Sequence, residues 1–254
     1  PPFTKPLKGM FIFNFRMLIA LTILSFHGVD KRGKTMAGIT GKKAVLAAAV
    51  LMAGAVMASD APLLTAVKDG ELGRVQQLIT EGADLDVRTL DGSSALLLAT
   101  RDNQIDIAQA LIEAGANVNQ KNLIHDSPYL LAGASGRNEI LQLALAHGAD
   151  LKSTNRYGGT ALIPACERGH VETVRLLIAA GVDLNHVNRL GWTCLMEAIV
   201  LSDGGPAHQQ IVSQLIDAGA DLNLPDSNGM SPLQQAQKRG QSEIALMLRN
   251  AGAH

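Results

Sequence analysis

Apolar residues recur along the chain from about residue 59 onward in a pattern with one constant period. In each copy, a short and almost wholly apolar segment precedes a second segment whose apolar residues have helical spacing, as in Val174, Leu177 and Ile178. Such spacing is typical of a helix that buries one face. Each copy therefore predicts two short helices, of which the second is amphipathic.

Two markers keep the same interval through the copies. An alanine lies in the first predicted helix, and a glycine follows the second, where it can end the helix as a C-cap. The alanines are Ala66, Ala99, Ala132, Ala165, Ala198 and Ala236. The glycines are Gly82, Gly115, Gly148, Gly181, Gly219 and Gly252. The interval between successive alanines is constant up to Ala198, and the last interval is longer by five positions. The pattern predicts six repeats, with five extra residues in the fifth.

Polar residues mark the starts and turns of these helices. A hydroxyl-bearing residue precedes the first helix of five copies, where it can accept a hydrogen bond from a free backbone amide. These residues are Ser94, Ser127, Thr160, Thr193 and Ser231. Aspartates also recur at one place in the repeat, and we interpret them as turn residues rather than as catalytic carboxylates. They are Asp84, Asp150, Asp183 and Asp221.

The copies resemble ankyrin repeats, as in TALIPACERGHVETVRLLIAAGVDLN at residues 160–185. A unit of about 33 residues with a turn and two helices is the signature of that family. The resemblance implies an all-α fold, an ankyrin-repeat solenoid of helix-turn-helix units with β-hairpin-like loops. The six units are expected at about 59–89, 90–122, 123–155, 156–188, 189–226 and 227–254.

One position departs from the ankyrin pattern in every copy. The family's opening Thr-Pro-Leu-His ends in a histidine that helps to hydrogen-bond neighbouring repeats, and this histidine is absent here. The residues in its place are Leu64, Leu97, Leu130, Ile163, Met196 and Gln234. We expect apolar contact between repeats to replace the missing hydrogen bonds.

Residues 36–58 have the composition of a secretory signal peptide. Lys42 and Lys43 precede an uninterrupted apolar segment at 44–56, and small residues stand before Ser59. This segment is shorter than the roughly 20 apolar residues needed to span a bilayer, so we expect cleavage near Ala58 and a periplasmic or secreted protein. Residues 1–35 are interpreted as an upstream segment outside the natural protein. The alternative is that residues 11–26 are retained as a membrane segment.

The charge and the cysteines of residues 59–254 exclude some classes of partner and of stabilisation. This region has 14 Lys or Arg and 22 Asp or Glu, a net charge of −8, which argues against nucleic acid as a partner. Cys166 and Cys194 lie on neighbouring first helices but about five residues out of register. That offset predicts roughly 7.5 Å along the helix axis and roughly 8–10 Å between axes. We therefore expect both cysteines to stay reduced, since disulfide partners need Cα atoms within about 7 Å.

The sequence offers no pattern of catalytic or ligand-binding chemistry. The seven histidines include no pair with the spacing of a zinc site, and His170 follows Gly169 as in the structural Gly-His pair of ankyrin repeats. No Gly-x-Ser-x-Gly elbow or phosphate-binding loop is present in the sequence. We expect no enzyme activity, no metal site and no cofactor.

Ankyrin proteins usually bind a protein on the concave face, which consists of the loop tips and the exposed side of the first helices. The family's variable positions there carry aromatic, apolar and arginine residues in this chain, types that include those enriched in binding hot spots. The candidate contacts are Leu123, Ile124, Arg156, Tyr157, Arg189, Leu190, Trp192 and Met230. We expect Trp192 to be the strongest anchor. The alternative is that these residues only cover neighbouring loops, and the five extra residues near Pro206 are equally compatible with a binding loop or a neutral insertion.

These patterns favour a non-catalytic protein–protein interaction module. Resemblance to exported bacterial ankyrin proteins indicates a role in binding or supporting a periplasmic protein. Two alternatives remain open: an exported effector or toxin-associated protein, and a membrane-tethered scaffold if the leader is retained.

Overall fold

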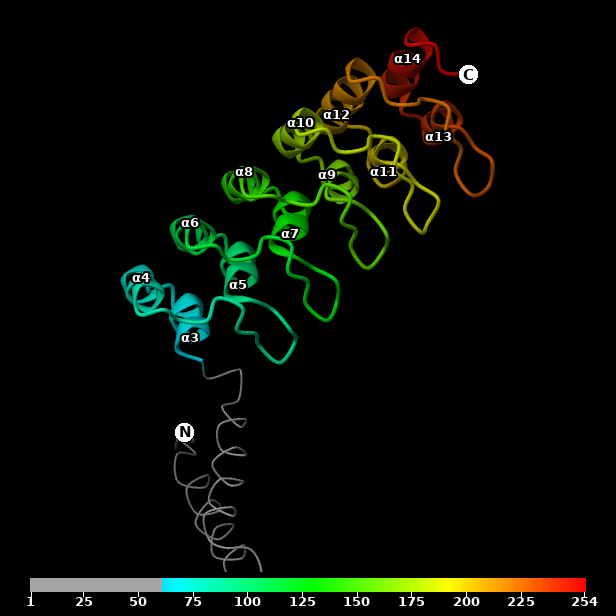
Figure 1. Cartoon of the computed structure of the whole chain (residues 1–254). Coiled ribbons are helices and arrows are strands. Elements are labelled where there is room, and N and C mark those ends of the chain that lie inside the picture. The colour runs from blue at the N-terminus through cyan, green and yellow to red at the C-terminus, as the bar shows by residue number, and fades with distance from the viewer. Residues whose placement is uncertain (1–60) are drawn as a thin grey trace, which may run out of the picture. The chain divides into compact units, whose positions relative to one another are not determined.

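A computed structural model of the chain describes residues 61–254. The predicted upstream segment 1–35 and signal peptide 36–58 lie outside the described residues. Within 61–254, twelve helices follow one another as six pairs (Figure 1). They are α3 (Pro62–Lys68), α4 (Leu72–Thr80), α5 (Ala95–Arg101), α6 (Ile105–Glu113), α7 (Pro128–Ala134), α8 (Asn138–Ala146), α9 (Leu162–Glu167), α10 (Val171–Ala179), α11 (Cys194–Val200), α12 (Pro206–Asp217), α13 (Pro232–Lys238) and α14 (Ser242–Asn250).

The helices form two rows, which confirms the predicted all-α solenoid. The first helix of every pair lies in one row and the second helix in the other, and long loops extend from the row of first helices (Figure 1). The marker alanines are buried in the row of first helices, which the apolar faces of the second helices cover. Residues 61–254 contain no β-strand, and their loops hold a single isolated antiparallel bridge between Arg88 and Ser94. Within that same range, no helix is both long enough and apolar enough to cross a membrane.

Most of the predicted helix caps are present. The side chains of Ser94, Ser127, Thr193 and Ser231 each accept a hydrogen bond from the backbone amide three residues later. Thr160 is the exception, because α9 begins one residue later than its counterparts and has Ala161 as its N-cap residue. The Thr160 hydroxyl is buried without a hydrogen-bond partner. The capping prediction is therefore wrong at this one position.

The turn residues also take their predicted roles. Asn103 replaces the glycine of other copies between the helices of the second repeat and has φ 53°. Each recurring aspartate accepts a hydrogen bond from the backbone amide two residues later, at 2.9–3.0 Å. These carboxylates are thus held in turns, as the interpretation of the sequence required.

Contacts between repeats combine apolar and polar groups. Leu64, Leu97, Leu130, Ile163 and Met196 are buried, as expected for residues that replace the family's histidine. The sixth copy differs, because Gln234 is exposed and completes a capping box with Ser231.

Side chains near the starts of the second helices supply hydrogen bonds between repeats. Gln104 Nε2 donates to the Val67 carbonyl at 2.9 Å, and Gln241 Nε2 donates to the Ile199 carbonyl at 2.9 Å. Each of these carbonyls belongs to the last turn of the first helix in the preceding repeat. The hydrogen bonds of the missing histidine are therefore replaced in part by side chains at another position.

The expectation that the cysteines stay reduced is wrong. Cys166 of α9 and Cys194 of α11 form a disulfide, with Cα atoms 5.5 Å apart. The expectation assumed that neighbouring first helices stack in register. In the structure, the start of one first helix lies beside the end of the preceding one. Gly133 and Ala161, at the equivalent positions one repeat earlier, show the same stagger, because a Cβ added to Gly133 would lie 2.8 Å from the Cβ of Ala161.

Candidate functional site: a groove on the concave face

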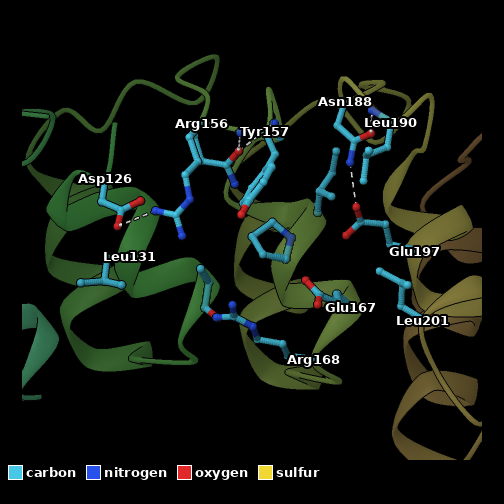
Figure 2. A pocket seen from close by; sticks show the side chains of 15 residues that line it. Asp126, Leu131, Arg156, Tyr157, Glu167, Arg168, Asn188, Leu190, Glu197 and Leu201 are labelled. Carbon is cyan, nitrogen blue, oxygen red and sulfur yellow. Dashed lines mark hydrogen bonds and ion pairs between the residues drawn. The ribbon is translucent and has the colours of Figure 1, made fainter. Parts of the chain in front are cut away.

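A groove of about 380 Å³ crosses three repeats on the side where the loops extend. Helices α7, α9 and α11 form its floor, and the loops before α7, α9 and α11 form its wall (Figure 2). Its lining residues are Asp126, Leu131, Ala134, Asn155, Arg156, Tyr157, Gly159, Ile163, Pro164, Glu167, Arg168, Asn188, Leu190, Glu197 and Leu201. The stacking of repeats therefore creates a continuous surface that no single repeat could provide.

Asparagine side chains hold the loop tips above the groove. Asn155 Oδ1 accepts hydrogen bonds from the amides of Tyr157 at 2.8 Å and Gly159 at 3.1 Å. Asn188 Oδ1 likewise accepts hydrogen bonds from the amides of Leu190 at 2.9 Å and Trp192 at 3.1 Å. Tyr157 and Leu190 are held in place by this turn, although their side chains are 57% and 51% exposed.

The two arginines of the groove already have partners. Arg156 lies 3.6 Å from the Asp126 carboxylate, and its guanidinium carbon is 5.2 Å from the centre of the Tyr157 ring. Arg168 Nη1 donates to the Ala134 carbonyl at 2.5 Å. Both cations thus join neighbouring repeats along the groove, and Figure 2 shows the pair of Arg156 with Asp126.

Glu197, on the floor helix α11, is a carboxylate that is almost wholly buried. It is 5% exposed, and its Oε1 accepts a hydrogen bond from Asn188 Nδ2 at 2.7 Å (Figure 2). Burial raises the pKa of Glu197 to about 7, and the negative charge of Glu167 adds to this effect. The hydrogen bond from Asn188 and the charge of Arg168 act in the opposite direction and are the smaller effects.

Three of the eight predicted contacts line the groove: Arg156, Tyr157 and Leu190. Leu123, Ile124 and Arg189 are exposed at the tips but do not line it. Trp192 and Met230 are half-buried and also lie outside the lining.

The loop tips also contact one another. The Arg189 amide donates to the Tyr157 carbonyl at 3.0 Å, and the Leu123 amide donates to the Asp91 carbonyl at 3.0 Å. The loop backbones thus pack against one another, while the side chains of Leu123 and Arg189 stay exposed. The part of these residues in binding stays a prediction.

Sequence reasoning missed Glu197. It stands directly before the marker Ala198, where the other copies have Thr65, Leu98, Leu131, Pro164 and Gln235. A charge at a position that is neutral in every other copy was the signal that could have identified it. Among residues 61–254, no group of three or more His, Cys, Asp or Glu is placed to hold a metal ion.

Comparison with known proteins gives a consistent result. The family described as ankyrin repeats in three copies matches residues 23–122 and 129–226, which is more than half of the chain. The first match begins upstream of the residues that the structure describes.

Solved structures share the fold at several levels of identity. An ankyrin repeat domain from Acinetobacter baumannii AYE is 56% identical, with 76% of this chain and 98% of that domain covered and a TM-score of 0.74. The ankyrin repeat protein EF0377 is 40% identical, with 74% and 96% covered and a TM-score of 0.72. The ankyrin domain of Bcl-3, a member of the IkappaB family, is 28% identical, with 77% and 87% covered and a TM-score of 0.70.

A curated relative matches over a shorter range. YahD of Escherichia coli K12, named as an ankyrin repeat protein, is 50% identical over 58 residues. This match spans 23% of the present chain and 29% of YahD.

Proposed function

The chain belongs to the ankyrin repeat family, and on that premise we propose that it binds another protein on its concave face and has no reaction of its own. Ankyrin repeats are generally protein–protein interaction modules. The observation that carries the proposal is the groove over α7, α9 and α11, which is bordered by Tyr157, Leu190 and Leu201. These three side chains are 47–57% exposed, and a partner would cover them.

We propose further that the partner is met outside the cytoplasm, in the periplasm or after secretion. The signal-peptide composition of residues 36–58 supports export. The disulfide between Cys166 and Cys194 supports it independently, because disulfides persist in oxidising compartments. Support of a periplasmic protein fits both observations, and action as an exported effector or toxin-associated protein is the second candidate. A membrane-tethered scaffold would require retention of the leader.

Capture of the partner by the full chain, followed by an affinity measurement, tests the binding face. We expect the Tyr157→Ala, Leu190→Ala double variant to bind the captured protein at least tenfold more weakly, because both side chains border the groove. Gln76→Ala on α4 is the control, since this exposed residue lies on a second helix far from the groove lining. Unchanged affinity of the double variant would contradict the proposed face.

Trp192 gives a separate prediction about the extent of the interface. If the partner also covers the tip beside the groove, Trp192→Ala should weaken binding by roughly thirtyfold, as truncation of a central interface tryptophan costs about 2 kcal/mol. The melting temperature should change little. A large fall in melting temperature with unchanged affinity of the folded fraction would instead assign Trp192 to packing between loops.

A further inference from the structure

We propose that the groove receives a lysine or arginine side chain of the bound protein, with Glu197 and Glu167 as its acceptors. This inference rests on the proposed function and names the chemistry of the partner segment that enters the groove. Three observations carry it: a buried carboxylate without a cation, arginines that are already engaged, and an apolar lining above the carboxylates.

The first observation is the state of Glu197. Its side chain is among the buried polar groups, yet no Lys, Arg or His nitrogen of residues 61–254 lies within ion-pair distance of it. Asn188 is its one hydrogen-bond donor in this range and reaches only Oε1. Oε2 has no hydrogen-bond donor within this range and is not one of its fully enclosed unpaired atoms, so it can accept a donor that enters the groove.

The neighbouring repeats show that the fold does not require this charge. Leu131 and Pro164 occupy the equivalent positions in the two preceding repeats and line the same groove. In the next repeat the equivalent Gln235 donates its amide to Asp226, where Glu197 instead accepts from Asn188. Of the three repeats that line the groove, only the fifth therefore has a charged side chain at this position, on the floor helix α11.

The second observation is that the groove's own arginines form no ion pair with these acids. Arg156 is paired with Asp126, and Arg168 donates to the Ala134 carbonyl and lies beyond ion-pair distance of Glu167 and Glu197. Glu167, half-buried on α9, forms no ion pair within the described residues. The disulfide that joins the adjacent Cys166 to Cys194 fixes α9 against α11, so the two acidic helices cannot move apart.

The third observation is the shape and composition above the carboxylates. Figure 2 shows Tyr157 and Leu190 reaching down from the loops, with Glu167 and Glu197 below them on the helices. Leu201 completes an apolar border. Lysine and arginine have long apolar stems with a charged head, which fits an apolar entrance over an acidic floor. A tyrosine ring also attracts a cation at close range.

The charge of the whole repeat region favours the same occupant. Residues 59–254 carry a net charge of −8, so a basic segment would be attracted at long range while an acidic one would be repelled. The charge of the groove floor and the net charge of the repeat region therefore both favour a basic partner segment.

Selection from a displayed library of random dodecapeptides against the full chain tests the inference. We expect enriched peptides to share a lysine or arginine, and Glu197→Gln to lower their affinity at least tenfold. Replacing that basic residue by alanine should lower affinity of the wild type similarly but have little further effect on Glu197→Gln. This non-additivity marks direct pairing, since independent changes would add.

Matched variants separate binding from folding. Glu113→Gln, on the exposed side of α6 outside the groove, should leave peptide affinity unchanged. Glu197→Leu, which copies the residue of the third repeat, should bind as weakly as Glu197→Gln while retaining helical circular dichroism. If changes at Glu197 impair folding, Glu167→Gln tests the second acid, and we expect it to lower the affinity for the basic peptides.

The outcomes distinguish the inference from the proposed function. Enrichment of peptides without a basic residue, whose affinity falls with Tyr157→Ala but not with Glu197→Gln, would overturn the cationic occupant and leave the binding face intact. Binding that is indifferent to both substitutions, or the absence of any groove-dependent binder, would overturn both.

Discussion

At the scale of single residues, the burial of the Glu197 carboxylate lowers the stability of the unbound protein. A carboxylate that is 5% exposed loses most of its hydration on folding, and one hydrogen bond from Asn188 compensates only part of that loss. In the unbound protein this residue therefore costs stability when it is ionised. A partner's cation would remove that cost at the moment of binding.

This cost predicts a dependence of stability on pH. The pKa of Glu197 is about 7 in the folded chain, whereas an unfolded glutamate has a pKa of about 4.3. The folded state thus binds the proton more tightly, so stability falls as pH rises from about 4.3 to 7 and then levels. We expect the free energy of unfolding of Glu197→Gln to exceed that of the wild type at pH 8 by up to about 4 kcal/mol, at about 1.4 kcal/mol per pKa unit.

Chemical denaturation of both proteins between pH 5 and pH 8 measures this difference. The gap between variant and wild type should widen as pH rises. A constant gap would mean that Glu197 does not titrate in this range and that its pKa in the folded chain is close to the ordinary value.

Residue-level prediction from sequence succeeded where a position repeats its role and failed where one copy departs from it. The aspartate turns and four hydroxyl caps followed from a recurring residue type with one physical use. Tyr157 and Leu190 were named from the family's variable positions and line the groove, while their part in binding stays a prediction. The unusual charge of Glu197 is visible in the sequence, but its burial could not be derived in the same way, because burial depends on the loop above it and on the helix of the next repeat.

At the scale of elements, the stagger between first helices decides which residues meet. Gly133 on α7 faces Ala161 at the start of α9, and a Cβ at Gly133 would lie 2.8 Å from the Ala161 Cβ and 3.2 Å from its carbonyl oxygen. Both contacts are with atoms close to the backbone, so neither can move away cheaply. Small residues at this contact allow the helices to approach closely.

We predict that Gly133→Ala destabilises the protein by about 1–2 kcal/mol. The overpacking cost of about 1–3 kcal/mol outweighs the gain in helix propensity, which is at most about 1 kcal/mol. Thermal or urea unfolding provides the measurement. The double variant Gly133→Ala, Ala161→Gly should recover most of the loss, because it moves the methyl group to the other helix. Failure of the second change to recover stability would show that the cost does not come from this contact.

The Cys166–Cys194 disulfide lies between α9 and α11, at the positions that correspond to Gly133 and Ala161 one repeat earlier. It closes a loop with a sequence separation of 28 residues between its cysteines, for which loop-closure entropy predicts a stabilisation of about 3–4 kcal/mol. We expect the Cys166→Ala, Cys194→Ala double variant to lose about that much unfolding free energy and to become insensitive to reductant. A wild type that unfolds at the same denaturant concentration with and without reductant would contradict this contribution.

This disulfide also shows why element geometry was harder to predict than element identity. The repeat interval defines which helices are neighbours, but the offset between them depends on how side chains interdigitate. An in-register stack would have placed Cys166 and Cys194 too far apart, and the observed stagger brings their Cα atoms to 5.5 Å. The packing of the two helices sets this Cα–Cα distance, and the sequence of either helix alone does not.

At the scale of the whole molecule, the repeat made the architecture predictable from sequence alone. A unit of two helices cannot bury its apolar face by itself, so stacking with neighbours is the one solution available to it. The six marker alanines and their buried positions bear this out. The groove follows from the stack as well, since its floor draws on three successive first helices.

At the same scale, the proposed signal peptide and the disulfide together yield a prediction about processing. If residues 36–58 direct export, the exported protein should begin at Ser59, because small residues precede that bond. Its two cysteines should be oxidised, since export carries them into an oxidising compartment. Deletion of residues 36–58 should leave the protein in the reducing cytoplasm with two free thiols.

Intact mass and thiol alkylation of the two forms measure both properties at once. The exported form should start at Ser59 and take up no alkylating reagent until it is denatured and reduced. The form without residues 36–58 should take up two equivalents when denatured without reductant. Free thiols in the exported form would contradict the disulfide, whereas a retained leader with the protein in the membrane fraction would favour the tethered scaffold.

The form with free thiols should also bind the groove's basic peptides more weakly, because the disulfide holds α9 against α11. Such a difference would link oxidation of the two cysteines to the ability of the groove to bind.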